Sequence, residues 1–465
     1  MRNIKVLQIA LILVLGIVPA LSAEWGGSID QGLSYLDTGE PTLSSTTTLA
    51  LGSSGVIGRR LSYGVSMASS ISTDLLDPGD VIPEPWFEIL NVDTAYLNWP
   101  IIREPLDPNS MTVTIGRFPI SDITGMVVAT PVDGFSLSMG YSRMTYDVSL
   151  GYTGLLWQSA NSILMSDTDV ANSGDLSEVF GSPRLIGQAK IQLPVIFQQG
   201  ISLAAIFQED MWSSESVNFA EPGDTEQGVG GPLDTQYFGI AATGPIGRTL
   251  YHSTFFYYNT GRMLSYVDED DPDTDAEFIY EYTPISAYVA GTSIRYYMPQ
   301  LFQSSAALRV IFSSGDADFT KYYEGNSEGN ANQFVPISAG SFGAVFSPKL
   351  GNVGLTEIQY SLKPLESSDN WMLSTLQTVA RLMVFFRPTT GPISEAGVVV
   401  GDGKNLLGTE LDLSANLTPL PDLGLSATFG LFVPAGVDGA GAFSEDYLED
   451  GKVQTSLNLQ ASLGF

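Results

Sequence analysis

The sequence predicts an all-β protein: a transmembrane, antiparallel, up-and-down β-barrel of about 18–20 strands, with short periplasmic turns and long acidic extracellular loops. Three features predict this fold: a leader for export, segments in which apolar and polar residues alternate, and connections that alternate between short and long. A chain that crosses a bilayer without helices must close its sheet, because lipid offers no partner to an unpaired backbone group.

The first residues have the three-part layout of a secretory signal peptide. Arg2 and Lys5 form a short basic region, residues 6–18 are almost all apolar, and small residues precede the expected cleavage site after Ala23. Ser22 is the alternative site. An uncleaved anchor helix is the competing interpretation, but the apolar run is shorter than the roughly 20 residues that a comfortable membrane span needs.

The remainder of the chain is expected to form one domain. A length of 465 residues would suggest about two or three soluble domains, but no linker, heptad stretch or charged tail divides the chain. We predict a signal peptide at residues 1–23 and a single outer-membrane β-barrel domain at residues 24–465. Cysteine is absent, so hydrogen bonds and packing must hold the exported domain without disulfides.

The charge of the chain is strongly acidic, with 20 Lys and Arg against 51 Asp and Glu. No nucleic-acid partner is expected, since phosphate binding needs a basic surface. The chain is not expected to be disordered either, because 44% of its residues are hydrophobic and 11% are aromatic.

Apolar and polar residues alternate in many segments. Successive strand side chains point to opposite faces, so each such segment has one apolar and one polar face. The pattern is seen at residues 135–142, 145–153, 187–193, 306–313, 357–363, 410–417 and 452–465.

Loop lengths choose between a membrane barrel and a soluble β-sandwich, which alternates in the same way. Short gaps alternate along most of the chain with long polar gaps, and a sandwich has no reason to gather its long loops at one end. We predict outward strands at residues 144–157, 200–212, 248–260, 304–314 and 423–434, and returning strands at 183–197, 233–243, 284–298, 335–347 and 452–465. Residues 371–405 are ambiguous, which leaves both 18 and 20 strands open.

Aromatic residues near the predicted strand ends suit the interfacial girdles of a barrel, although any one of them could equally be a core residue. These are Trp99, Trp157, Trp212, Tyr257, Tyr258, Tyr296 and Tyr297.

The last strand, KVQTSLNLQASLGF, ends on the large apolar residue Phe465. It resembles the C-terminal signal of bacterial outer-membrane barrels, which the barrel assembly machinery recognises. This resemblance implies export to the outer membrane and contact with its lipid.

Further stretches resemble porins. AYLNW (95–99), TVTIGRFPI (112–120) and TPVDGFSLSMGYS (130–142) look like early porin strands, and residues 406–436 are similar to the closing strands of the alginate-export type of porin. The chain departs from that family at Phe118, where Gln often follows Gly-Arg. The resemblance implies a passive channel for small hydrophilic solutes.

A barrel of this size would enclose an aqueous lumen, whose wall charges and inserted loops would set selectivity. Residues 118–133 or 158–182 are the candidate constriction loops. Strand phase nominates these pore-lining residues: Lys190, Arg295, Arg309, Glu357, Gln359, Lys363, Arg381, Glu410 and Asp412. The alternative is that these charges only pair with one another along the wall.

An acidic stretch at residues 266–278 suggests either a solvated loop tip or a divalent-cation site, because Ca²⁺ takes several carboxylate oxygens. The candidate ligands are Asp268, Asp270, Asp271, Asp273 and Asp275. The spacing differs from that of a 12-residue calcium loop and lacks its turn glycine. No other cofactor is expected.

Catalysis is not expected. The chain has one histidine, His252, and no G-x-S-x-G motif, so a nucleophile paired with a general base is not apparent. A hydrolase centred on His252 is the enzyme-class alternative. The main prediction is a porin-like channel that prefers cations or neutral solutes; the runner-up is a structural or surface-interaction barrel, adhesin-like, with acidic loops closing the lumen. The oligomeric state is left open.

Overall fold

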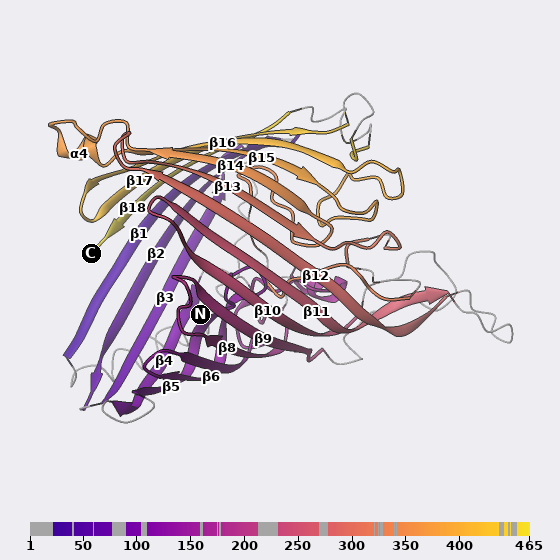
Figure 1. Ribbon diagram of the computed structural model, residues 1–465, viewed down its shortest axis with the longest axis horizontal. Coiled ribbons are helices and arrows are strands. Elements are labelled where there is room, and N and C mark those ends of the chain that lie inside the picture. The colour runs from indigo at the N-terminus through magenta and orange to yellow at the C-terminus, as the bar shows by residue number, and fades with distance from the viewer. Residues whose placement is uncertain are drawn as a thin grey trace, which may run out of the picture.

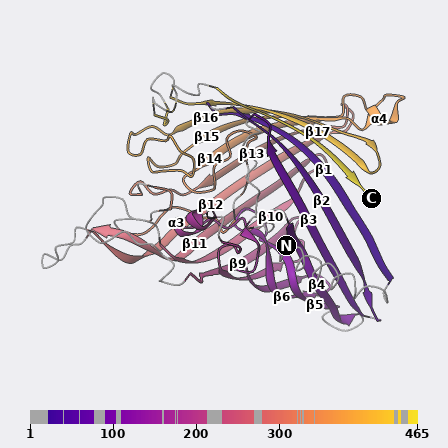
Figure 2. The ribbon, with the colours of Figure 1, turned by 180° about the vertical axis from the view of Figure 1, so that it is seen from behind.

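Eighteen antiparallel strands form one closed sheet in the computed structural model of the chain (Figures 1 and 2). The structure describes residues 22–465, except 40, 59, 77–89, 104–108, 159–160, 174, 176–177, 213–230, 269–277, 320, 324, 326–328, 339, 341, 437–440, 445–446 and 448–452. The strands are β1 (Ser22–Asp37), β2 (Pro41–Ile57), β3 (Leu61–Asp74), β4 (Leu90–Arg103), β5 (Ser110–Ser121), β6 (Ala129–Gly140), β7 (Thr145–Tyr152), β8 (Arg184–Gln192), β9 (Gly200–Asp210), β10 (Leu233–Ile246), β11 (Leu250–Asp268), β12 (Phe278–Met298), β13 (Ser304–Ser313), β14 (Gly354–Leu362), β15 (Gln377–Phe386), β16 (Leu406–Leu420), β17 (Leu423–Pro434) and β18 (Gln454–Gly464). The described residues also include two short helices, α3 (Asp167–Ser173) and α4 (Trp371–Ser374).

Pairing between the first and last strands closes the barrel. β1 pairs with β18 from Ser28↔Gly464 to Asp37↔Thr455, and each strand also pairs with its neighbour in sequence. The predicted fold class is confirmed, with the smaller of the two strand numbers. Because the number is even, β1 starts and β18 ends at the same end of the barrel, which is also the end where α4 lies (Figure 1).

The predicted leader lies almost wholly outside the described residues, since β1 begins at Ser22. Among the described residues, no helix is long and apolar enough to span a membrane.

The alternation of residues separates the two faces of the sheet as expected. Large apolar side chains such as Ile115, Ile358, Leu382 and Leu457 are 39–57% exposed on the outer face. This apolar outer face is the lipid-facing surface of a transmembrane barrel. We call the end with the short turns periplasmic, as in barrels of this kind.

The returning strand predicted at residues 335–347 is wrong. These residues form part of a long connection between β13 and β14, and β14 is the returning strand. They alternate like a strand, but other groups satisfy their backbone: Ile337 N–H donates to Val127 O at 2.8 Å, and Val345 N–H donates to the Glu410 carboxylate at 2.7 Å. The segment therefore needs no neighbouring strand.

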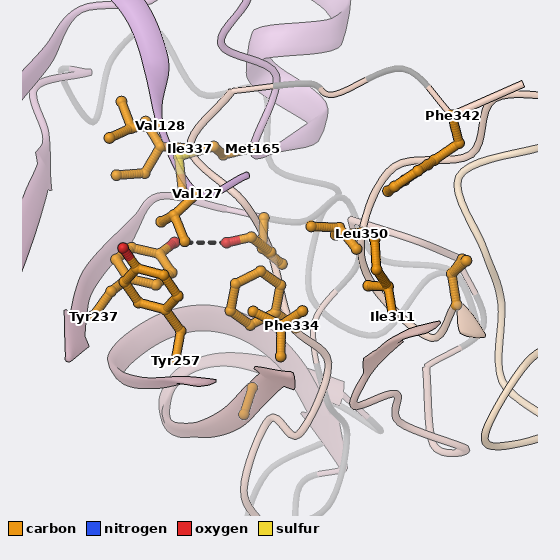
Figure 3. Close-up of a cluster of buried hydrophobic side chains, with 14 of the residues drawn as sticks. Val127, Val128, Met165, Tyr237, Tyr257, Ile311, Phe334, Ile337, Phe342 and Leu350 are labelled. Carbon is orange, nitrogen blue, oxygen red and sulfur yellow. Dashed lines mark hydrogen bonds between the residues drawn. The ribbon is translucent and has the colours of Figure 1, made fainter. Parts of the chain in front are cut away.

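A buried core in the lumen includes Ile393 of the β15–β16 connection and Ala442 and Phe443 of the β17–β18 connection, and three further connections supply most of its loop residues (Figure 3). These three connections are residues 122–128 between β5 and β6, 153–183 between β7 and β8, and 314–353 between β13 and β14. Side chains from all three meet: Val127, Met165 and Ile337 are fully buried in one cluster. Both candidate constriction loops thus turn inward, together with a third that the sequence did not indicate.

Wall tyrosines bind these connections by their hydroxyl groups. Tyr257 on β11 donates to Asp122 Oδ2 at 2.8 Å, and Tyr237 on β10 donates to Val335 O at 2.6 Å. The Asp122 carboxylate also accepts N–H groups from Thr124, Val127 and Val128, which fixes its own tight turn. Tyr257 is therefore fully buried in the lumen, and its expected place in an outer girdle is wrong.

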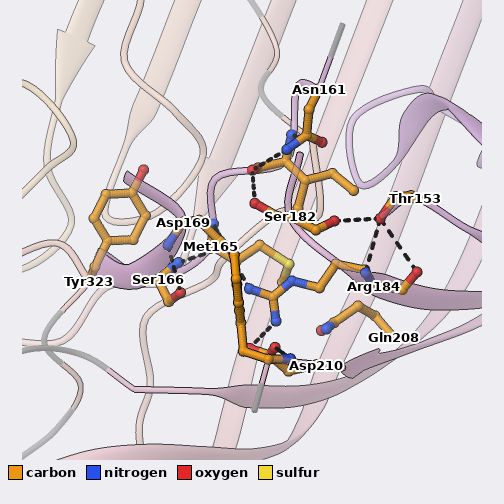
Figure 4. Close-up of polar contacts among 12 residues, drawn as sticks. Thr153, Asn161, Met165, Ser166, Asp169, Ser182, Arg184, Gln208, Asp210 and Tyr323 are labelled. Carbon is orange, nitrogen blue, oxygen red and sulfur yellow. Dashed lines mark hydrogen bonds and ion pairs between the residues drawn. The ribbon is translucent and has the colours of Figure 1, made fainter. Parts of the chain in front are cut away.

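A buried group of charges fastens α3 to the wall (Figure 4). Arg184 on β8 is fully buried and lies between Asp169 of α3, at 2.5 Å, and Asp210 of β9. Trp212 Nε1–H and Met165 N–H also donate to the Asp169 carboxylate, each at 2.9 Å. Burial opposes ionisation of Asp169, but Arg184 and these hydrogen bonds outweigh it and lower the pKa of the carboxyl below its usual value.

Replacing Asp169 by Asn should release α3 from the wall. Removing one partner of a buried ion pair costs about 3–5 kcal/mol, because it leaves a buried charge without compensation. We expect amide hydrogen exchange within residues 153–183 to accelerate strongly, whereas Val170→Ala, at an exposed site of the same helix, should change it little. Equal exchange in the two variants would contradict this role.

The same contact should weaken in acid. The lowered pKa of Asp169 means that its stabilisation is complete above the unfolded pKa of about 3.9 and is lost as the pH falls through the folded value.

Candidate functional site

The lumen is bounded by two unlike walls. On β17, β18, β1, β2 and β3, the inward side chains are mainly hydroxyl, amide and glycine residues that remain partly accessible. Hydroxyl groups pair across the strands, as in Thr48 with Ser70 at 2.8 Å and Thr46 with Ser72 at 3.1 Å. We call this surface the hydroxyl wall. It contributes neutral groups that both donate and accept hydrogen bonds.

The inserted connections pack mainly on the strands from β5 to β16, and they reach the hydroxyl wall at Phe432 of β17. Of the residues that the structure describes, every buried apolar side chain lies between Phe118 and Phe443, so β1 to β4 and β18 provide none. The inward side chains of β1 to β3 are consequently not covered by an apolar core.

The basic residues are distributed unevenly between the walls. None of β1, β2, β3, β17 and β18 contains Lys or Arg. Their inward positions include the acidic residues Glu24, Asp30 and Asp74. The predicted pore-lining residues did not indicate this lack of basic residues on one wall. The sequence shows that Lys and Arg are absent from each of these five segments, but the pattern has a meaning only once the segments are known to be neighbours in the barrel.

Six of the predicted pore-lining residues lie together on the inner face of β13 to β16. Two ion pairs join neighbouring strands: Arg309 to Glu357 at 2.5 Å, and Arg381 to Asp412 at 2.5 Å. The arginine side chains are 29% and 27% exposed and the carboxylates are at most 5% exposed, so each acid largely neutralises a partly open guanidinium. Gln359 lies opposite Arg381 in the register, and Glu410 lies opposite Met383.

The other three predicted residues lie towards the periplasmic end. Lys190 on β8 donates to Ser121 O at 2.9 Å, and Arg295 on β12 is exposed. Lys363 follows the end of β14, and its backbone N–H donates to Phe302 O in the neighbouring turn. These three residues are not in contact with the β13–β16 group through any interaction seen among the described residues.

Glu410 and Arg381 hold a turn of the inserted connection, residues 342–346, against the wall. The Glu410 carboxylate is fully buried and accepts N–H groups from Val345 at 2.7 Å and Phe346 at 2.9 Å. Arg381 Nη1–H donates to Phe342 O at 3.1 Å. Gly343 permits the approach, because a Cβ there would lie 2.3 Å from Glu410 Oε2.

An aromatic stack supports the same turn. Phe346 lies parallel to Phe432 of β17, with ring centroids 4.5 Å apart, and edge-on to Phe385 of β15 at 5.0 Å. Such pairs add to the apolar burial, so the turn is held by both packing and charge-assisted hydrogen bonds.

The candidate cation ligands are mostly outside the described residues. Asp268 ends β11, and Asp270, Asp271, Asp273 and Asp275 all lie in the segment 269–277. The part of the chain that the structure describes contains no group of three or more His, Asp or Glu side chains placed to hold a metal ion.

His252 lies on the outer face of β11, opposite Ile294 of β12. Its Nε2 is 2.7 Å from Gln199 Oε1. At that place it faces away from the lumen and its hydrogen-bond partner is an amide, so the geometry offers no support for a hydrolytic centre.

Replacing Glu410 by Gln should loosen the turn at residues 342–346. An amide cannot accept both N–H groups as a carboxylate does, and each unsatisfied buried donor costs about 1–3 kcal/mol. We expect hydrogen exchange at Val345 and Phe346 to accelerate by roughly 5- to 150-fold, the equivalent of that free energy. Leu413→Ala, at a lipid-facing site of the same strand, should leave both amides unchanged; unchanged exchange in the Glu410 variant as well would show that the carboxylate does not hold the turn.

Comparison with known proteins gives structural neighbours but no relatives by sequence. No family model and no curated protein matches the chain. Among solved structures, it is similar to the outer membrane protein OpdK of Pseudomonas aeruginosa (12% identity, 96% of this chain and 99% of that chain, TM-score 0.53). It is also similar to OccAB2 of Acinetobacter baumannii (11%, 96% and 98%, 0.53) and to OccK11 (OpdR) of P. aeruginosa (12%, 95% and 96%, 0.51).

These likenesses run along almost the whole chain and concern the fold. The specific resemblance to alginate-export porins stays a prediction. By its closed 18-stranded antiparallel barrel, the chain shares the fold of these porin-like outer-membrane β-barrels.

Proposed function

We propose that the chain forms a channel for passive diffusion of small hydrophilic solutes across the outer membrane, with a preference for cations or neutral solutes. The observation that carries this proposal is the hydroxyl wall, five adjacent strands without a single Lys or Arg. Its partly exposed hydroxyl and amide groups can exchange hydrogen bonds with a passing solute or its water.

The charges within reach of this passage favour cations. Asp30 lies half-buried on the inner face of β1, with Ser28 Oγ–H donating to it at 2.8 Å. Across the lumen, Arg309 and Arg381 are each paired with a carboxylate. Lys190 and Arg295, two basic residues on the inner face, lie towards the periplasmic end. A net acidic passage raises the local concentration of cations and lowers that of anions.

One similar structure, OpdK of P. aeruginosa, was solved with vanillate. A barrel of this fold can therefore hold a small molecule, which supports the proposed channel. Because the hydroxyl wall offers no basic group to a carboxylate, we expect anions such as vanillate to be disfavoured here.

A structural or surface-interaction barrel is the second candidate function. The observation that favours it is the extent of the core inside the lumen, to which five connections contribute. The proposed role of Phe465 in recognition by the assembly machinery fits either function: its backbone pairs with Gly27 at the seam between β18 and β1, and its ring is 65% exposed.

Conductance in a planar bilayer under a salt gradient tests the proposal. The protein without residues 1–23 should give steady ohmic openings with a reversal potential that favours cations. Ser70→Lys places a cation on the hydroxyl wall and should shift the reversal potential towards anions, whereas Ser70→Thr should not.

Two results would count against the proposal. A correctly inserted barrel without conductance would contradict the channel and favour the structural role. An anion-selective wild-type channel would contradict the proposed charge preference.

A further inference from the structure

Two periplasmic turns combine bulky exposed side chains with an unfavourable backbone conformation. In the β8–β9 turn, Phe197 and Gln198 have φ of 50° and 66°; in the β12–β13 turn, Phe302 and Gln303 have φ of 51° and 47°. Positive φ at both central residues is the signature of a type I′ hairpin turn, for which Asn-Gly is strongly preferred. A β-carbon and a large ring make the left-handed region costly.

The strain is not relieved by burial of the rings. Phe197 is 93% exposed, and its neighbours Val195 and Ile196 are 69% and 47% exposed. In the other turn, Leu301 and Phe302 are 48% and 49% exposed. The backbone pairing is nevertheless complete, with Ile196 N–H and Gln199 N–H each donating to the other's carbonyl. At Phe197, therefore, burial of the ring does not offset the unfavourable backbone conformation.

The second turn is joined to another apolar projection. Lys363 N–H donates to Phe302 O at 2.9 Å, and Gln303 Nε2–H donates to Glu366 at 2.5 Å, which ties the turn to the β14–β15 connection. That connection carries α4, whose Trp371 is 52% exposed. Thr375, directly after α4, exchanges hydrogen bonds with Thr418 and fixes the helix beside the end of β16.

We propose that the periplasmic turns between β8 and β15 are immersed in the interfacial layer of the inner phospholipid leaflet, with Phe197, Phe302 and Trp371 as anchors. Continuity with the lipid-facing surface identifies lipid as the occupant: Val195 continues the outward alternation of β8 through Ile191 and Leu193, beyond the last strand residue. Aromatic rings are the side chains that favour this layer.

The charges of neighbouring turns agree with a phospholipid surface. Arg143 in the β6–β7 turn and Arg248 in the β10–β11 turn are exposed at the same end of the barrel. Arginine side chains reach from apolar surface to phosphate groups, so they suit the border between acyl chains and headgroups. Phe197 and Phe302 lie in the turns on either side of Arg248 and would set how deeply this part of the periplasmic rim enters the interfacial layer.

Spin labels can measure the depth directly, since the chain has no cysteine of its own. Single variants Phe197→Cys and Phe302→Cys, labelled with a nitroxide and reconstituted in phosphatidylcholine–phosphatidylglycerol vesicles, should be relaxed more by oxygen than by a water-soluble nickel chelate. Leu382→Cys, on the lipid-facing side of β15, is the matched membrane control. Asp422→Cys, at an exposed carboxylate in the β16–β17 turn, is the aqueous control.

The accessibility of labels at positions 197 and 302 to oxygen and to the nickel chelate should lie between the values of the membrane control and the aqueous control. Accessibility to the nickel chelate equal to that of Asp422→Cys would overturn the proposal. Low accessibility to both oxygen and the chelate would also overturn it and would indicate contact with a protein, either a second copy or a periplasmic partner.

A second variant changes the stability of the protein in opposite directions, depending on whether the β8–β9 turn lies in water or in lipid. Phe197→Asn combined with Gln198→Gly installs the preferred type I′ sequence, so it should stabilise a turn that lies in water. If the turn is anchored in lipid, the loss of the ring should instead lower the urea midpoint of unfolding in vesicles. A raised midpoint would contradict the anchor.

Discussion

The pairing of β1 with β18 is the interaction on which the rest of the structure depends. Without it, two strands would expose unpaired backbone groups to lipid, where no water can satisfy them. Closure joins the two ends of the described chain at one seam, where Phe465 exchanges backbone hydrogen bonds with Gly27. It also makes the hydroxyl wall continuous, because β17 and β18 meet β1, β2 and β3 only through this contact.

The two walls of the lumen differ because the inserted connections are bound to particular strands. Asp122 meets Tyr257, Asp169 meets Arg184, and Glu410 receives the turn at 342–346; all three wall residues belong to β8, β11 or β16. The fixed core thus packs on strands from β5 round to β17, where it contacts Phe432, and, among the described residues, leaves the inner faces of β1, β2 and β3 without buried apolar residues. The charged residues of the strands that carry the core bind the inserted connections or form ion pairs along the wall. Few unpaired basic groups therefore face the accessible passage.

Local patterns predicted the fold class because a period of two is strict in a half-buried strand. The same reasoning predicted the last strand at residues 452–465 and an inward orientation for Arg309, Glu357, Arg381 and Asp412. It did not predict that these four residues form two ion pairs, because pairing depends on the strand register, which loop lengths alone do not fix. Two failures have one physical cause. Both predictions were made from neighbouring residues in the sequence. The amide of Val345 in the segment 335–347 is instead satisfied by Glu410, which lies at least 63 residues beyond the segment. The hydroxyl group of Tyr257 is bound by Asp122, which belongs to another connection. Such partners lie beyond any local window.

The central claim is that solutes pass along the hydroxyl wall. Cysteine-substituted channels in a planar bilayer test it most directly, with a cationic and an anionic methanethiosulfonate reagent of similar size. The account predicts rapid, permanent block at Ser70→Cys, faster with the cationic reagent, and no effect at Ala204→Cys, an inward site on β9 that the inserted core covers. Block at Ala204→Cys with none at Ser70→Cys would place the passage on the other wall and contradict the account.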